Sequence, residues 1–350
     1  ADLRAQNGQS AVRHYLFGSG RGIFEAAVWE EVYGANKDAA PGVSGLRRSW
    51  LRALVGKKPS RDPEPGRTPL QTVAEWVDGL WQGGAPQLLS TTRLRLIPKS
   101  KGGFRPLAMG ETVATVAKGI VAGRLSADAR EWMQSRGQWG TGVSDATAKV
   151  ASLATTAWEH GWNVTAIDLR NAYGCVHRTA VAAAVEGVAA PLAPFVCLCL
   201  QPNTVIGESI ERTVSRGVMQ GDPMASVLFN LTIAKMMADV KDTCAGSGVE
   251  VLSPSSSDLP QVLDALERGA VTAQVVCVWY ADDATILWRD AASHAIFVDY
   301  LTTALHDIGL SLALQKCTVV PGNGRVDGSV ELEAAARGMA TSSCVSVLGA

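Results

Sequence analysis

The sequence lacks cysteines at the spacings of a disulfide framework or a zinc site. Its seven cysteines are an odd number, and no two of them form a CxxC pair. Cys197 and Cys199 are too close together for a useful bridge and have no histidine partners nearby. We therefore expect reduced thiols in an intracellular protein, nuclear or cytoplasmic.

The sequence also lacks an initiating methionine, a signal peptide and any evident internal repeat. A chain that starts Ala1-Asp2 is expected to be a fragment of something longer. The most apolar window, residues 179–200, carries Glu186, Pro191 and Pro194. We interpret it as buried helix and loop rather than a membrane span, and we expect no membrane partner.

Strong net charge is absent too, since the formal net charge is -1. With 350 residues, 47% of them hydrophobic and 19% charged, the chain is typical of an ordinary globular protein of one large domain or two to three subdomains. The charge is nevertheless unevenly distributed. Residues 93–136 hold nine basic and three acidic residues, and a second basic cluster spans residues 47–67. Each cluster is either a solvated face or a local electrostatic footprint for a ligand.

The most informative stretch is Val275–Arg289, with Tyr280-Ala281-Asp282-Asp283 at its middle. Two runs rich in β-branched and aromatic residues flank two adjacent acids, which predicts a tight hairpin with both carboxylates at its tip. Carboxylates are not expected between apolar strands unless something pairs with them. Mg²⁺, which prefers oxygen ligands and bridges to phosphates, is the obvious partner. The alternative is an ordinary acidic turn.

A second carboxylate follows a short apolar strand at residues 164–167, where Asp168 is delivered at the strand end and Tyr173 lies five residues on. Upstream, residues 94–107 predict a hairpin with a Gly-Gly turn and basic residues. Its lysines and arginines can hold a polyphosphate, or they simply keep an exposed hairpin soluble. Residues 215–223 form a glycine-bearing loop before a helix at residues 224–240. Residues 244–270 are largely polar and are expected to form a surface insertion.

Taken in order, these segments resemble the fingers and palm of a reverse transcriptase, from about Leu46 to the C-terminus. Residues 94–107 resemble the fingers hairpin, 168–173 palm motif A, 216–230 motif B, and Tyr280–Asp283 motif C. Residues 309–317 are similar to motif D, and 347–349 to the start of motif E. The QGDP form of motif B and the loop QWGTG at residues 138–142 favour the non-LTR retrotransposon branch.

The resemblance implies an α+β fold of the right-hand polymerase type. We expect fingers and a palm with a small antiparallel sheet backed by helices, including those at residues 224–240 and 291–307, and no thumb. The implied division is an N-terminal extension at 1–38, fingers at 39–165, and a palm at 166–350 that contains the insertion at about 244–270.

The implied function is synthesis of DNA from dNTPs on an RNA or DNA template, by phosphoryl transfer with two Mg²⁺ ions or Mn²⁺ as substitute. The expected metal ligands are Asp168, Asp282, Asp283 and the carbonyl of Leu169, with Lys316 as proton donor to pyrophosphate. The expected dNTP contacts are Lys99, Arg105, Tyr173 and Gln220. The expected template and primer contacts are Gly221, Asp222, Pro223, Tyr280, Leu348 and Gly349. The ring of Tyr173 stands where related RNA polymerases have a second acid, so it is expected to exclude a ribose 2′-hydroxyl.

Two alternatives stay open. One is a catalytically silent reverse-transcriptase-like domain that binds nucleic acid or acts as a scaffold, although a pure binding role would not need three crowded acids. The other is a different palm polymerase, either viral and RNA-dependent or telomerase-like, and Tyr173 argues against the first of these. The sequence departs from the family at Ala313-Leu314-Gln315, where motif D usually has an asparagine. It also has no recognisable thumb, endonuclease or zinc-knuckle pattern, so we expect a polymerase core from a longer reading frame.

Overall fold

The computed structural model describes residues 10–18, 21–34, 39–59, 68–99, 102–207, 210–323 and 328–343. The chain forms two compact units: unit 1 is Ala1–Asp128 with Ala182–Ala225, and unit 2 is Ala129–Val181 with Ser226–Ala350. This division differs from the contiguous one expected at residue 165. The reason is that residues 182–225 return to unit 1 and add strands to its sheet.

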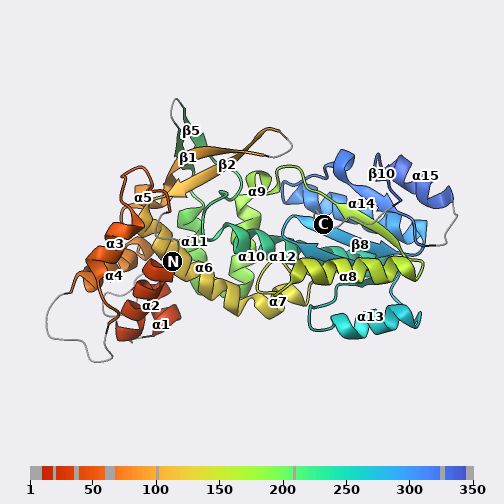
Figure 1. Ribbon diagram of the computed structural model, residues 1–350, viewed down its shortest axis with the longest axis horizontal. Helices are drawn as coiled ribbons and strands as arrows, with labels where there is room; N and C mark the ends of the chain where they lie inside the picture. Colours follow the sequence, from red (N-terminus) through yellow and green to blue (C-terminus); the bar gives the residue numbers. More distant parts are fainter. Residues whose placement is uncertain are drawn as a thin grey trace. The chain divides into compact units, whose positions relative to one another are not determined.

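The strands of unit 1 form a four-stranded sheet in the order β2-β1-β4-β5 (Figure 1). β1 (Thr91–Pro98) and β2 (Phe104–Gly110) pair antiparallel as the predicted basic hairpin. β4 (Asn203–Ile206) joins β1 in parallel and continues into β5 (Glu211–Val214). The sheet therefore combines segments about a hundred residues apart in the sequence.

Helices make up the rest of unit 1, and helix α4 illustrates why they form where they do. It runs from Pro69 to Trp81, and Thr68 and Gln71 close its first turn with a reciprocal capping box. Its apolar residues recur every three or four positions and are buried. The other helical elements are α1 (Ala11–Phe17), α2 (Arg21–Gly34), α3 (Arg48–Val55), α5 (Pro86–Ser90), α6 (Thr112–Asp128), η1 (Ala190–Leu192) and α11 (Ala193–Cys199).

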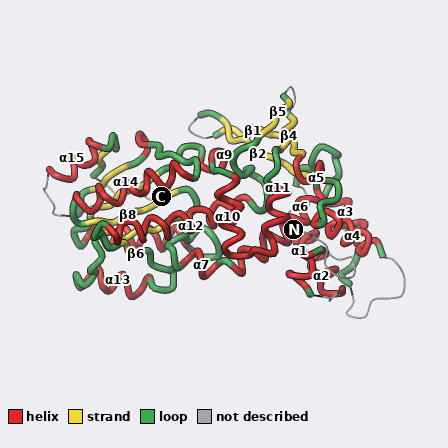
Figure 2. The backbone as a smooth tube through the Cα atoms, turned by 180° about the vertical axis from the view of Figure 1, so that it is seen from behind, coloured by secondary structure: helices red, strands yellow, loops and turns green. Residues whose placement is uncertain are grey.

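Unit 2 contains a six-stranded sheet in the order β10-β9-β3-β8-β7-β6. The strands are β3 (Asn163–Ile167), β6 (Val251–Leu252), β7 (Val275–Tyr280), β8 (Asp283–Trp288), β9 (Thr318–Val320) and β10 (Ala340–Thr341). The four central strands pair antiparallel, and the short edge strands β6 and β10 pair in parallel. Figure 2 labels β6 and β8 of this sheet among the helices of unit 2. The expected α+β fold with a palm sheet backed by helices is confirmed, but the expected antiparallel sheet is mixed, because its two edge strands pair in parallel.

The helices of unit 2 cover both faces of this sheet. They are α7 (Arg130–Gln134), α8 (Ala146–Glu159), α9 (Ala172–Cys175), α12 (Ala225–Gly246, which begins at the last residue of unit 1), α13 (Leu259–Glu267), α14 (Ala291–Asp307), η2 (Leu314–Lys316) and α15 (Gly328–Ala336). Helix α10 (Arg178–Ala189) continues from unit 2 into unit 1. On one face, α8 and α13 bury a core with Val164, Val276 and Leu287. On the other, His294 of α14 stacks on Trp288 and contacts Thr165.

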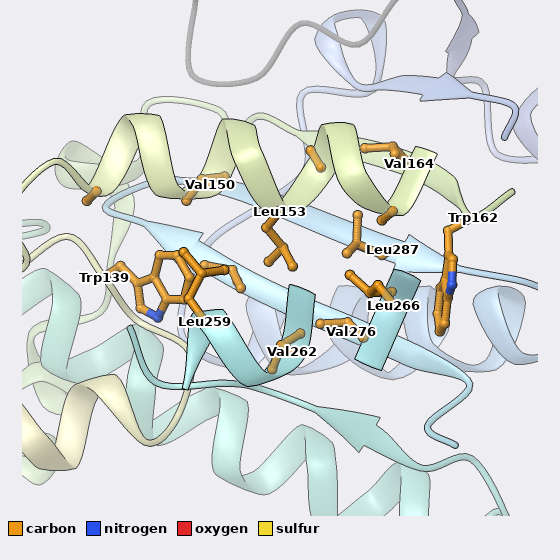
Figure 3. Packing of buried hydrophobic residues seen from close by; sticks show 14 of the residues in the cluster. Trp139, Val150, Leu153, Trp162, Val164, Leu259, Val262, Leu266, Val276 and Leu287 are labelled. Carbon is orange, nitrogen blue, oxygen red and sulfur yellow. The ribbon is translucent and has the colours of Figure 1, made fainter. Parts of the chain in front are cut away.

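The segment at 244–270, expected to be a surface insertion, instead contributes to the core of unit 2. Figure 3 shows side chains of α8, α13 and the sheet pointing toward one another. Leu259, Val262 and Leu266 of α13 belong to this buried cluster, and β6 extends the sheet beside β7. The spacing of these three residues places them on one face of α13, which packs against the core.

The apolar run Arg178–Cys199 is long and apolar enough to cross a membrane by length and composition. The structure divides it into α10, η1 and α11, and Pro191 and Pro194 stand at the N-terminal ends of the two later elements. Val181, Val185, Phe195 and Val196 are fully buried. The run is therefore divided into short helices, as expected, but only 39% of its most apolar window is buried.

The second basic cluster, at residues 47–67, is only partly a surface feature. Arg48 is buried, where it donates to the carbonyl of Glu31 at 2.5 Å and lies 3.6 Å from its carboxylate. Arg52 donates to the carbonyls of Val32 and Tyr33. These two arginines therefore hold α3 against the C-terminal end of α2. Arg61 and Arg67, which also belong to this cluster, lie outside the described residues.

Candidate catalytic site

Strand pairing brings the predicted acids together at one end of the central strands of the unit 2 sheet. β3 pairs with β8 so that Ile167 lies opposite Ala284. Asp168 directly follows Ile167, and Asp283 directly precedes Ala284. Asp282 lies in the two-residue loop that joins β7 to β8, where Tyr280 pairs with Asp283. Neighbouring strands thus bring the backbone positions of the three acids to the same end of the sheet.

The electrostatics of Asp283 show that these carboxylates are crowded. Burial, together with the negative charges of Asp282 and Asp168, raises the pKa of Asp283 to about 6, against the opposing effect of Lys316. Lys316, in η2, places its Nζ 3.0 Å from Oδ1 and 3.3 Å from Oδ2 of Asp168. A carboxyl whose charge is disfavoured by neighbouring acids gains from a shared cation.

The donor set fits a hard divalent cation, because it consists of carboxylate oxygens. As the side chains stand, the described residues contain no group of three or more His, Cys, Asp or Glu gathered in a metal-binding arrangement, and the cation at Asp168 is the ammonium of Lys316. The backbone carbonyl of Asp168 accepts from the amide of Ala313 at 2.8 Å. Leu169, the residue expected to supply a carbonyl ligand, is buried beside Leu312.

Replacing Asp283 by asparagine is expected to change how stability depends on pH. The folded-state pKa of about 6 lies above the ordinary 3.8, so the contribution of this carboxyl is fully present below about pH 4 and is lost as the pH rises through 6. The full shift corresponds to about 3 kcal/mol, reduced because the group is partly open to solvent. Metal-free Asp283→Asn should therefore gain unfolding free energy over the parent at pH 8 but not at pH 4. Equal differences at both pH values in urea denaturation would refute this.

Tyr173, the predicted sugar gate, is held within unit 2 by helix α12. Its ring stacks on Phe229 with centroids 4.6 Å apart at 17°. Its hydroxyl is hydrogen-bonded to Ser226, and burial raises its pKa, with Asp282 and Tyr280 acting in the same direction. The ring is therefore held where the charge of Asp282 affects the pKa of Tyr173. The partners Ser226 and Phe229 were not identified from the sequence. Their spacing of three along a helix was the available signal.

The loop at residues 220–223, before α12, belongs to unit 1. Backbone hydrogen bonds and an ion pair hold it in place. The backbone carbonyl of Gln220 accepts from the amide of Ala108 at 2.7 Å. Gly221 has φ +99°, and an added Cβ would lie 2.4 Å from the carbonyl oxygen of Ala108, so glycine is required at this approach to β2. The carboxylate of Asp222 accepts from the amide of Met224 at 2.9 Å and from Nζ of Lys118 at 2.6 Å. Asp222 therefore has an internal structural partner, whatever its role toward a template.

Lys118 was not singled out by sequence reasoning, yet it is 4% exposed and also donates to the carbonyl of Leu89. We expect Lys118→Met to destabilise the protein by about 3 kcal/mol, because it leaves the carboxylate of Asp222 without its cation. The double variant Lys118→Met/Asp222→Asn should recover most of this loss. Urea denaturation of the single and double variants measures both effects, and a double variant as unstable as the single one would contradict the pairing.

The remaining predicted residues divide into those that the structure describes and those that lie outside the described residues. Lys99 and Arg105 are exposed at the end of the β1–β2 hairpin in unit 1, where Lys99 and Gly103 close the turn by a 3.0 Å backbone hydrogen bond. Pro223 lies two residues before α12. Leu348 and Gly349 lie outside the described residues. The structure thus unites the acids, Lys316, Tyr173 and Tyr280 in unit 2, whereas Lys99, Arg105 and the loop at 220–223 belong to unit 1.

The chain is similar to known proteins of one family. A family model described as "Reverse transcriptase (RNA-dependent DNA polymerase)" matches residues 97–349. The retrovirus-related Pol polyprotein from the type-2 retrotransposable element R2DM of Drosophila melanogaster is 22% identical over 265 residues. That match covers 70% of this chain but 23% of the relative, so the chain spans less than a quarter of that protein's length.

Solved structures with some likeness include two telomerases. One, from Candida albicans in complex with a fragment of telomeric RNA, has a TM-score of 0.47 and 12% identity and covers 67% of this chain and 43% of its own. Another, from Candida tropicalis without its C-terminal domain, has a TM-score of 0.45 and 12% identity and covers 81% and 62%. The family model spans more than half of the chain, including all three acids. The chain therefore belongs to the reverse transcriptase family of RNA-dependent DNA polymerases.

Proposed function

We propose that this chain synthesises DNA from dNTPs on an RNA template by phosphoryl transfer at Asp168, Asp282 and Asp283. The observation that supports this most is the pairing of β3 with β8, which sets the acid at the end of one strand beside the acids of the adjoining turn. Such an arrangement is costly without a cation. It is the arrangement that nucleotide addition needs, because that reaction is catalysed mainly by positioning and charge neutralisation.

When bound, two Mg²⁺ ions, or Mn²⁺ in their place, would activate the primer 3′-hydroxyl and neutralise the triphosphate. Asp168 and Asp282 would hold them, with Asp283 and the carbonyl of Leu169 as further ligands. We assign to Lys316 the donation of a proton to the leaving pyrophosphate, since its ammonium already lies against Asp168. The basic side chains of Lys99 and Arg105 would bind the triphosphate.

Recognition of the remaining substrate atoms is assigned to the other predicted residues. Gln220 would face the nascent base pair, because its Oε1 is buried without a hydrogen-bond partner in the described part of the chain. Template and primer would contact Gly221, Asp222, Pro223, Tyr280, Leu348 and Gly349. We further propose an intracellular setting, nuclear or cytoplasmic, without a membrane partner.

The experiment that tests this function is extension of oligo(dT) on poly(rA) with dTTP and Mg²⁺ or Mn²⁺, beside a binding measurement on the same primer–template. Metal-dependent extension is the expected result. Tight binding without extension at any metal concentration would favour the second candidate, a silent domain that binds nucleic acid. Neither binding nor extension by this chain would count against both.

A further inference from the structure

The turn that carries Asp282 and Asp283 has an unfavourable backbone conformation. Only two residues, Ala281 and Asp282, separate β7 from β8. Ala281 takes φ +54°, a left-handed conformation that glycine, asparagine or aspartate adopts more readily than alanine. The turn also holds two adjacent carboxylates that repel one another. Strain of this kind persists only where surrounding groups fix the backbone.

Gln138 supplies such a group. Its side chain is completely buried, and its amide contacts both polar atoms of the Ala281 backbone. Oε1 accepts from the amide of Ala281 at 3.2 Å, and Nε2 donates to the carbonyl of Ala281 at 3.3 Å. Oε1 also accepts from the amide of Gly140 at 2.8 Å. A carboxamide offers a donor and an acceptor in one plane, which a carboxylate or an apolar side chain does not.

The segment that presents Gln138 is itself anchored on β7. The amide of Trp139 donates to the carbonyl of Trp279, and the amide of Trp279 donates to the carbonyl of Gly137, both at 2.7 Å. The indole of Trp139 is buried in the core of unit 2 and donates to Pro254 at 3.0 Å. Gln138 therefore projects from a rigid base, as a residue that positions a functional turn should.

A neighbouring contact limits the space around the turn. A Cβ added at Gly140 would lie 2.6 Å from the amide nitrogen of Ala281 and 2.8 Å from Nδ2 of Asn230. Asn230, on α12, donates to the hydroxyl of Thr141 at 2.7 Å. Residues 137–141 are thus packed between α12 and the turn, and the glycine permits this close approach.

We propose that Gln138 is a positioning residue for the catalytic turn: it holds Ala281 so that Asp282 and Asp283 stand beside Asp168. The inference rests on the proposed function for its catalytic consequence, and on the observed hydrogen bonds for its structural one. Loss of a group that orients metal ligands typically lowers metal affinity or activity 10- to 100-fold.

The test uses Gln138→Met, which keeps side-chain length but can form none of these hydrogen bonds. The matched control is Gln134→Met, four residues earlier, where the side chain contacts Ser256 rather than the turn. The first measurement is amide hydrogen exchange of Ala281 in metal-free protein, which does not depend on activity. Exchange should accelerate at least about tenfold in Gln138→Met and stay as in the parent in Gln134→Met.

The second measurement is primer extension at varied Mg²⁺ and dNTP concentrations. In Gln138→Met we expect kcat to fall about 10- to 100-fold and the half-saturating Mg²⁺ concentration to rise, with the KM for dTTP changed less than about threefold. Parent-like exchange at Ala281, or a parent-like kcat and Mg²⁺ response, would overturn the proposal. If the parent extends no primer, the proposed function fails, and the exchange measurement still decides whether Gln138 fixes the turn.

If Gln138→Met does not fold, Gln138→Glu replaces it. Glutamate keeps the acceptor for the amides of Ala281 and Gly140 but loses the hydrogen bond donated to the Ala281 carbonyl. It also adds a negative charge beside the turn. We expect Ala281 to remain protected from exchange while kcat falls, and a kcat equal to that of the parent would overturn the proposal.

Discussion

Asparagine in place of Asp282 is expected to abolish nucleotide addition while the protein stays folded. Asparagine has nearly the shape of aspartate but no negative charge, and a divalent cation bound by carboxylates depends on that charge. Asp282 is half-buried in the turn beside Asp168 and Asp283. We expect a loss on the order of 10³-fold or more in the rate of primer extension, the scale of removing a group that stabilises transition-state charge. Asp168→Asn should behave alike.

The matched control is Asp239→Asn on α12. Asp239 is exposed and forms a surface pair with Lys235 at 3.9 Å, a type of contact that contributes little. Its variant should extend primers at the parental rate. Unfolding in urea should show Asp282→Asn to be at least as stable as the parent at pH 8, because one of three crowded charges is removed. Extension by Asp282→Asn within tenfold of the parent would place the catalytic metal elsewhere.

The sequence was sufficient to predict the elements whose signals are local. The hairpin at 275–289, the helix at 291–307 and the strand before Asp168 were all anticipated from runs of apolar residues and from the acids that end them. β7 is buried on both faces, and its sequence VVCVWY is accordingly a continuous apolar run. That Asp168 and the acids of the hairpin lie near one another was expected from the resemblance to a polymerase palm, not from these local signals.

What the sequence did not reveal depends on contacts between distant segments. Lys118 is 104 residues from Asp222, and Gln138 is 143 residues from Ala281. No residue next to Lys118 or Gln138 in the sequence indicates which distant residue either of them contacts. The glycine-rich loop at 138–142 suggests flexibility, whereas pairing with Trp279 makes it part of the sheet edge. The return of residues 182–225 to unit 1 was likewise not predicted, because it depends on the parallel pairing of β1 with β4.

If the chain has the proposed polymerase activity, removing the ring of Tyr173 is expected to let it use ribonucleotides. A ring held by stacking on Phe229 and by Ser226 cannot readily move aside, so it should collide with a 2′-hydroxyl bound near the acids. We expect Tyr173→Ala to lower the preference for dTTP over UTP by roughly 10- to 200-fold, the range that one steric contact supplies. The ratio of kcat/KM values for the two nucleotides measures it.

Two further variants test the hydroxyl of Tyr173 and the stacking partner of its ring separately from the ring itself. Tyr173→Phe retains the ring and should keep most of the preference, although it loses the hydrogen bond to Ser226. Phe229→Leu removes the stacking partner, so the ring of Tyr173 gains freedom and the preference should fall part of the way. Tyr300→Ala, on α14 where the tyrosine contacts Ser247, is the matched control and should change nothing. If Tyr173→Ala discriminated as well as the parent, the residue would be a packing element between motif A and α12, and sugar selection would have to reside in another part of the chain.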